Sequence, residues 1–135
     1  MPRILCIDYG SKRTGIAVTD PLKIIATALT TIESKELISF LKNYFSKEQV
    51  ELILIGIPLN LDDSPTHGTP LVLATIKLLQ KNFPSIPIKT VDERYSSKFA
   101  SQAMVQMGMK KKDRQVKGNI DRVAATMLLQ EYLNK

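Results

Sequence analysis

Two short, continuous apolar runs, residues 3–7 and 50–57, most strongly limit what this chain can fold into. A run of this length without polar alternation is typical of a strand that is buried on both faces of a sheet. Such strands occur mainly in sheets that carry helices on both faces. The sequence therefore favours an α/β domain.

The segments around these runs predict the other elements. Glycines at 10 and 15 bracket a polar turn, and residues 16–18 and 24–32 then return as strands. Residues 86–91 predict a last strand. Helical spacing of apolar residues predicts four helices, over 35–45, 70–82, 97–107 and from residue 120 onward.

Polar side chains predict where three of these helices begin, with Ser34, Thr69 and Asn119 as N-caps. A cap at Asn119 puts Asp121 in the first turn of the last helix. The inward stripe of that helix is predicted to include Ile120, Val123, Ala124, Met127 and Leu128.

The predicted order is three strands, helix, strand, helix, strand, helix, helix. No linker or repeat divides the 135 residues, so we expect a single domain over residues 1–135. Its sheet should be five-stranded and mixed, with three antiparallel strands plus two parallel strands, flanked by helices.

Composition excludes several classes of site. One cysteine, Cys6, rules out an internal disulfide framework and a multi-cysteine zinc site, and one histidine, His67, rules out a histidine-rich metal site. No segment has the pattern of a signal peptide or the apolar length of a membrane span. We therefore expect a cytoplasmic protein with no membrane association.

The net charge of +6 favours an anionic partner. Four of these six charges lie in residues 110–117, where Asp113 opposes five basic residues. These are Lys110, Lys111, Lys112, Arg114 and Lys117. A solvated loop is the alternative interpretation of such a run.

Carboxylates fall at matched places in the predicted elements. Asp8 ends the first strand, Asp92 and Glu93 end the last one, and Asp121 lies on the closing helix. Since ligand sites of α/β sheets lie beyond the carboxyl ends of strands, these groups are predicted to form one site for a hard divalent ion. Two such ions, about 4 Å apart, would suit phosphodiester hydrolysis.

Each carboxylate also has a purely structural explanation, as a turn residue, a helix-dipole partner or a surface charge. Asp20 is excluded from the site. A turn centred near residues 12 and 13 pairs Asp8 with a residue near Ala17 and leaves Asp20 roughly 10 Å away.

Four motifs, in order along the chain, resemble those of the YqgF family, also called RuvX, of Holliday junction resolvases and pre-16S ribosomal RNA nucleases. They read IDYGSKRTGIAV (7–18), GIPLN (56–60), DERYS (92–96) and IDRVAA (120–125). The loop after Asn60 departs from the family's glycine-rich turn, with Asp63 where glycine is common and His67 further on.

The resemblance implies an RNase H-like fold and a divalent metal, Mg²⁺ or Mn²⁺, with metal and catalytic roles for Asp8, Glu93 and Asp121. Asp92 is the weaker candidate, because neighbouring strand residues face opposite ways. Substrate-binding roles are implied for Lys12, Arg13, Asn60 and Arg94. The basic segment 110–117 precedes Asp121 and is expected to bind backbone phosphates.

The predicted function is a metal-dependent endonuclease acting on structured nucleic acid, with 5′-end processing of pre-16S rRNA in ribosome biogenesis as its role. Holliday junction resolution and a non-catalytic nucleic-acid-binding module are the alternatives. An ATPase ranks last, because enzymes with a similar phosphate loop clamp ATP between two lobes. Expected partners are precursor rRNA or branched DNA and ribosomal precursor particles, bound by a monomer or homodimer.

Overall fold

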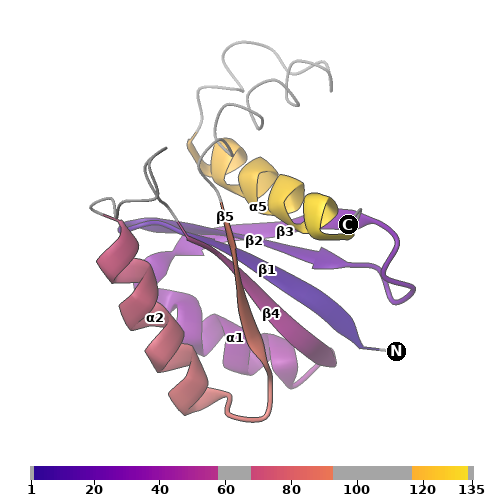
Figure 1. The fold of residues 1–135 in the computed structure, drawn as a ribbon, viewed down its shortest axis with the longest axis horizontal. Coiled ribbons are helices and arrows are strands. Elements are labelled where there is room, and N and C mark those ends of the chain that lie inside the picture. The colour runs from indigo at the N-terminus through magenta and orange to yellow at the C-terminus, as the bar shows by residue number, and fades with distance from the viewer. Residues whose placement is uncertain (1, 58–67, 93–116, 134–135) are drawn as a thin grey trace.

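Five strands form one mixed sheet in the order β3-β2-β1-β4-β5 (Figure 1). The computed structural model describes residues 2–57, 68–92 and 117–133. Its elements are β1 (Arg3–Tyr9), β2 (Arg13–Thr19), β3 (Ala26–Glu33), the 3₁₀ turn η1 (Ser34–Glu36), α1 (Leu37–Phe45), β4 (Val50–Ile57), α2 (Thr69–Asn82), β5 (Ile88–Asp92) and α5 (Lys117–Leu133). The helix predicted over 97–107 lies outside the described residues.

Strand directions confirm the predicted mixed sheet. β1 pairs antiparallel with β2, and β2 pairs antiparallel with β3. On the other side, β1 and β4 are parallel, as are β4 and β5. The apolar run of β4 occupies the predicted residues 50–57, because a short continuous apolar segment fits only a strand covered on both faces.

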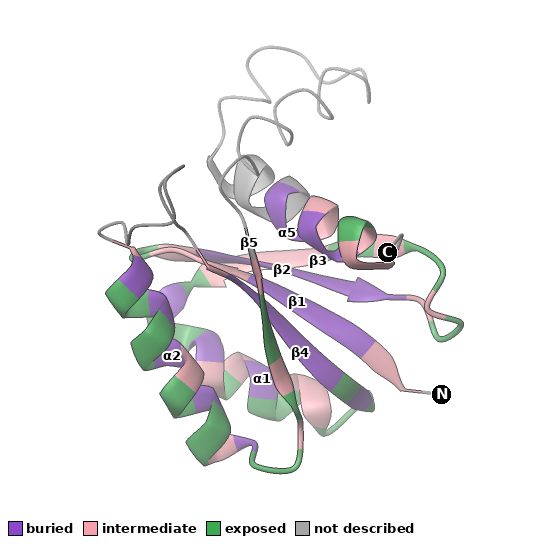
Figure 2. Cartoon of the chain, in the orientation of Figure 1, coloured by how far each residue is buried: buried purple, intermediate pink, exposed green. Residues whose placement is uncertain are grey.

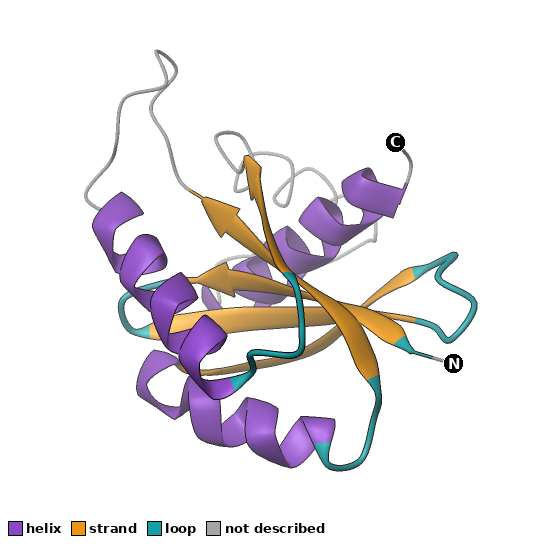
Figure 3. Ribbon diagram, turned by 60° about the horizontal axis from the view of Figure 1, so that its bottom comes forward, coloured by secondary structure: helices purple, strands orange, loops and turns teal. Residues whose placement is uncertain are grey.

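Helices cover both faces of the sheet (Figures 2 and 3). α1 and α2 lie on one face, where Leu5 and Ile7 of β1 pack in a cluster with residues of both helices. α5 lies on the opposite face, where Ile4 and Cys6 pack with its Leu129. The central strands β1 and β4 therefore have buried side chains on both sides, as their sequences predicted.

The predicted N-caps are wrong at all three helices. α1 follows η1, and Ser34 makes no capping bond because its hydroxyl is used elsewhere in the fold. α2 has Gly68 at the cap, so Thr69 is already helical. α5 begins at Lys117, two residues before Asn119.

The buried stripe of α5 also differs from the predicted one. Ala124 and Leu128 are buried as expected, whereas Met127 is only half-buried and Leu129 is fully buried. α5 contacts β1, β2 and β3, and packing on these strands shifts the buried stripe towards Ala125 and Leu129. Within the described residues, no helix is both long and apolar enough to span a membrane.

Candidate active site

The carboxyl end of β1 lies at the point where the direction of the chain across the sheet reverses. From β1 the chain moves through β2 to β3 on one side, and it then returns to add β4 and β5 on the other. Ile7 pairs with Ile55, and Ile57 pairs with Asp92, so the ends of all three parallel strands share one edge. Ligands of α/β sheets bind outside such a switch point.

Asp8 lies at this edge, as the second-last residue of β1. Alternate strand residues share a face, and Ile4 and Cys6 pack on the α5 side of the sheet. Asp8 therefore belongs to the face that α5 covers. It is half-buried and pairs with Gly15, which has no side chain to occupy the space beside the carboxylate.

This register corrects the predicted pairing of Asp8 with a residue near Ala17. Asp20 lies five residues beyond Gly15, about 16 Å along the strand, so it is still further from Asp8 than expected. Its carboxylate accepts N–H bonds from the turn that follows. The bond from Ile25 is the main reason that the pKa of Asp20 is lowered; burial opposes it, and bonds from Ile24 and Leu22 add to it.

The other predicted carboxylates are described only in part. Asp92 ends β5, directly after Val91, which packs in the cluster on the α5 side. Asp121 is the fifth residue of α5 and not in its first turn, because the helix begins earlier than predicted. It comes four residues before the buried Ala125 in the sequence.

The remaining predicted site residues lie outside the described ranges, except for Lys117, which opens α5. They are Glu93, Arg94, Asn60, His67, Lys110, Lys111, Lys112 and Arg114. Among residues 2–57, 68–92 and 117–133, no group of three or more His, Cys, Asp or Glu side chains forms a metal-binding cluster. The carboxylate trio therefore stays a prediction.

The turn between β1 and β2 places Lys12 and Arg13 next to Asp8. A Cβ atom at Gly10 would lie 2.5 Å from the carbonyl oxygen of Arg13, so the turn closes too tightly for any other residue. Arg13 shares the α5 face with Asp8, because Ala17 on the same strand packs there. Lys12 lies in this turn as predicted, whereas Arg13 is already the first residue of β2, which begins three residues earlier than the predicted strand.

Ser34 ties the turn to the start of η1. Its hydroxyl donates to the carbonyl of Gly10, and its backbone N–H donates to the carbonyl of Lys12 at 2.9 Å. A hydroxyl has one hydrogen, so the 2.8 Å bond between Thr14 Oγ1 and Ser34 Oγ must be donated by Thr14. Both side chains are buried, and the tie is therefore shielded from water.

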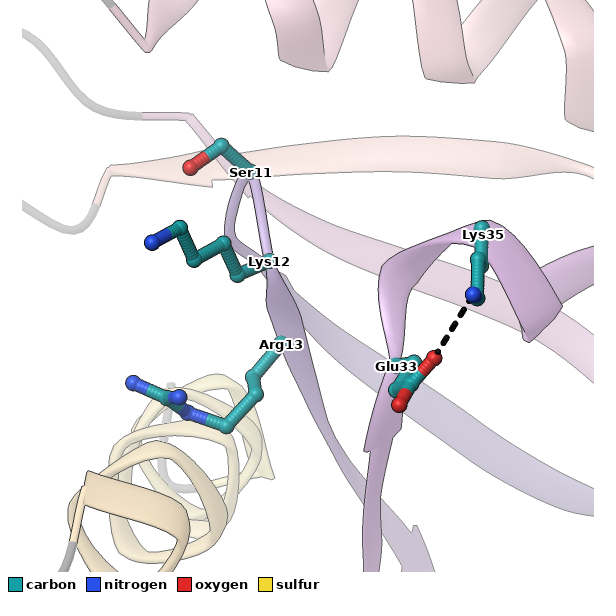
Figure 4. A pocket seen from close by; sticks show the side chains of 5 residues that line it. All are labelled: Ser11, Lys12, Arg13, Glu33 and Lys35. Carbon is teal, nitrogen blue, oxygen red and sulfur yellow. Dashed lines mark ion pairs between the residues drawn. The ribbon is translucent and has the colours of Figure 1, made fainter.

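A pocket of about 500 Å³ opens beside this turn (Figure 4). We call it the turn pocket, and it is lined by Ser11, Lys12, Arg13, Glu33 and Lys35. Sequence reasoning missed Glu33 and Lys35, because only the pairing of β2 with β3 brings these residues beside Arg13.

Comparison with known proteins finds relatives that match the whole chain. A Flavobacterium psychrophilum protein named "Putative pre-16S rRNA nuclease" is 50% identical over 135 residues, which cover 100% of this chain and 98% of the relative. A protein with the same name from Bacteroides thetaiotaomicron is 45% identical over 133 residues, 98% of this chain and 96% of the relative.

Solved structures show the same fold. Thermus thermophilus RuvC in complex with a Holliday junction substrate has a TM-score of 0.56 and 13% identity, over 98% of this chain and 94% of that one. The fold is RNase H-like, and together with the relatives it defines a nuclease, a hydrolase that acts on nucleic acids. A propionate kinase from Francisella tularensis, with a TM-score of 0.50 and 16% identity, matches 72% of this chain but only 38% of its own.

The family follows from the sequence as a whole. The model of the RuvX family, described as Holliday junction resolvase, matches residues 2–135. The chain belongs to this family, and the resemblance inferred from its four motifs is confirmed.

Proposed function

We propose that this chain is a metal-dependent endonuclease of the cytoplasm that trims the 5′ end of pre-16S rRNA. One observation carries the proposal: Asp8 lies at the switch point of an RNase H-like sheet, on the face covered by α5. The name shared by the relatives at 45% and 50% identity supports rRNA as the substrate.

Oxygen ligands suit the proposed metal. Asp8 is the half-buried carboxylate of the trio and pairs with Gly15 across the sheet, and carboxylate oxygens are ligands that a hard ion prefers. Glu93 and Asp121 would complete the ligand set, as the resemblance to the family implies. A bound Mg²⁺ or Mn²⁺ would supply an activated water and stabilise the leaving oxygen.

The residues of the chain would bind and orient the substrate. Lys12 and Arg13 stand on the tight turn beside Asp8 and would hold backbone phosphates. Asn60, Arg94 and the basic residues of segment 110–117 would extend this contact. Such contacts fix where the nucleic acid lies, without reading its sequence.

The proposal is tested by measuring the rate at which the wild type and the Asp8→Asn variant cleave pre-16S rRNA in Mg²⁺ or Mn²⁺. The asparagine variant should lose about 100-fold or more in rate, the scale on which removal of one transition-state-stabilising group acts. Asp20→Asn is the matched control, because Asp20 is on the same hairpin but at the other edge of the sheet. Equal rates for Asp8→Asn and the wild type, or full activity in excess EDTA, would refute the proposal.

Holliday junction resolution is the second candidate, favoured by the description of the family model. A four-way DNA junction should therefore be assayed beside the RNA, with the protein's mass in solution measured at the same time. Paired cuts in the junction by a dimer, with the RNA left intact, would assign the DNA function instead.

A further inference from the structure

The turn pocket carries an excess of positive charge. Lys12, Arg13 and Lys35 supply three positive charges and Glu33 one negative charge, a net charge of +2. Lys35 Nζ lies 3.3 Å from the Glu33 carboxylate, with the two side chains 79% and 61% exposed. An ion pair this exposed contributes little to stability, so a phosphate can compete with Glu33 for Lys35.

Ser34 holds the two sides of the pocket in a fixed relation. It lies between Glu33 and Lys35 in the sequence and is buried, while these two neighbours line the pocket and form an ion pair with each other (Figure 4). Its hydrogen bonds to Gly10 and Lys12 fasten the segment that carries Lys35 to the turn that carries Lys12. A ligand that bridges both sides therefore meets two backbone segments that are already held in place, which lowers the entropic cost of binding.

The turn pocket lies close enough to Asp8, the proposed catalytic carboxylate, for one nucleic-acid strand to contact both. Asp8 of β1 pairs with Gly15 of β2. Arg13, two residues before Gly15 on β2, pairs with Glu33 of β3. Two residues and two strand spacings separate Glu33 from Asp8, which gives about 12 Å between their Cα atoms. At a rise of roughly 3.4 Å per nucleotide along one strand, this corresponds to about two to four nucleotides.

We propose that the turn pocket is a second phosphate site, which holds a backbone phosphate of the nucleic acid about two to four nucleotides from the scissile bond. Lys35 is its assigned ligand beside Lys12 and Arg13. Glu33 competes with the phosphate for Lys35, and the ion pair between Lys35 and Glu33 breaks when the phosphate binds. The proposal rests on the proposed function for its nucleic-acid ligand and for the distance to the scissile bond, which assumes cleavage at Asp8, whereas phosphate binding at the pocket does not depend on cleavage.

Salt-dependent binding tests the site without cleavage. The full chain is titrated in EDTA against a fluorescein-labelled RNA hairpin and a labelled four-way DNA junction, and each Kd is measured by anisotropy. When salt is raised from about 50 to 200 mM, each phosphate contact contributes about a threefold loss of affinity. A variant that lacks one contact should therefore lose about threefold less affinity over this range than the wild type. Lys35→Ala should show this loss and Glu33→Gln should bind more tightly than the wild type.

Lys77→Ala is the matched control, because it removes the same charge from an exposed position on α2, across the sheet from α5. The same salt slope and Kd for Lys35→Ala and Lys77→Ala would overturn the proposal. Weaker binding by Glu33→Gln would overturn the role of Glu33 as a competitor.

The outcomes separate this site from the proposed function. Asp8-dependent cleavage together with equal salt slopes would refute the phosphate site alone. A flatter slope for Lys35→Ala together with no metal-dependent cleavage would refute the nuclease proposal alone.

Discussion

Replacing Ser34 with alanine removes the hydrogen bonds by which its hydroxyl ties η1 to the turn between β1 and β2. Ser34 is 7% exposed and its partner Thr14 is fully buried, so the variant leaves the Thr14 hydroxyl and the Gly10 carbonyl without their bonds. Each lost bond costs about 1 kcal/mol, and a buried group left unsatisfied costs about 1–3 kcal/mol. Allowing for partial relaxation, we expect the free energy of unfolding to fall by about 2–3 kcal/mol.

Urea and thermal denaturation of the purified variant measure this loss. For a domain of this size the melting temperature should fall by roughly 6–12 °C. A double-mutant cycle with Thr14→Val should give a coupling of about 1 kcal/mol, because each single change already breaks the Thr14–Ser34 bond.

Ser39→Ala is the matched control. Its hydroxyl also donates to a backbone carbonyl, that of Glu36 at 3.0 Å, but Ser39 is exposed on α1, so the change should stay within about 0.5 kcal/mol. If Ser34→Ala costs no more than Ser39→Ala, or if its effect simply adds to that of Thr14→Val, the buried tie does not stabilise the turn.

Three further predictions concern the turn, the α5 face and the far edge of the sheet. Gly10→Ala should weaken nucleic-acid binding and lower the melting temperature, because its Cβ would meet the carbonyl of Arg13; an unchanged Kd and melting temperature would contradict this. Leu129→Ala should cost about 2–5 kcal/mol in urea unfolding, since this α5 side chain is fully buried against the sheet. Asp20→Ala should melt below the wild type at neutral pH. Because the folded pKa of Asp20 is lowered, chiefly by the N–H of Ile25, this difference should shrink as pH falls from the ordinary value of 3.8 through the folded pKa; a constant difference would refute it.

The pattern of apolar residues along the sequence was sufficient to predict the sheet and the directions of its strands. Residues 50–57 form β4 with the predicted bounds, and residues 3–7 form most of β1, because a short apolar run is stable only when both faces of the strand are covered. The sequence also placed Asp8 at the edge where the parallel strands end. Its motifs identified the family before any geometry was considered.

Helix starts required the tertiary structure. Ser34 has the chemistry of an N-cap, yet its hydroxyl bonds to Gly10 and Thr14, which are 24 and 20 residues away. A hydroxyl takes whichever partners the folded chain presents, and neither partner is visible in a local window of sequence. The early start of α5 at Lys117 likewise moved Asp121 out of the first turn.

The turn pocket separates most clearly what the sequence determines from what only the tertiary structure decides. The sequence by itself determined that Lys12 and Arg13 stand on a glycine-closed turn after Asp8, because those residues are neighbours in the chain. Only the pairing of β2 with β3 decided that Lys35 and Glu33 join them. Strand register sets which distant side chains share a face, and it depends on the packing of the whole sheet and not on any one segment.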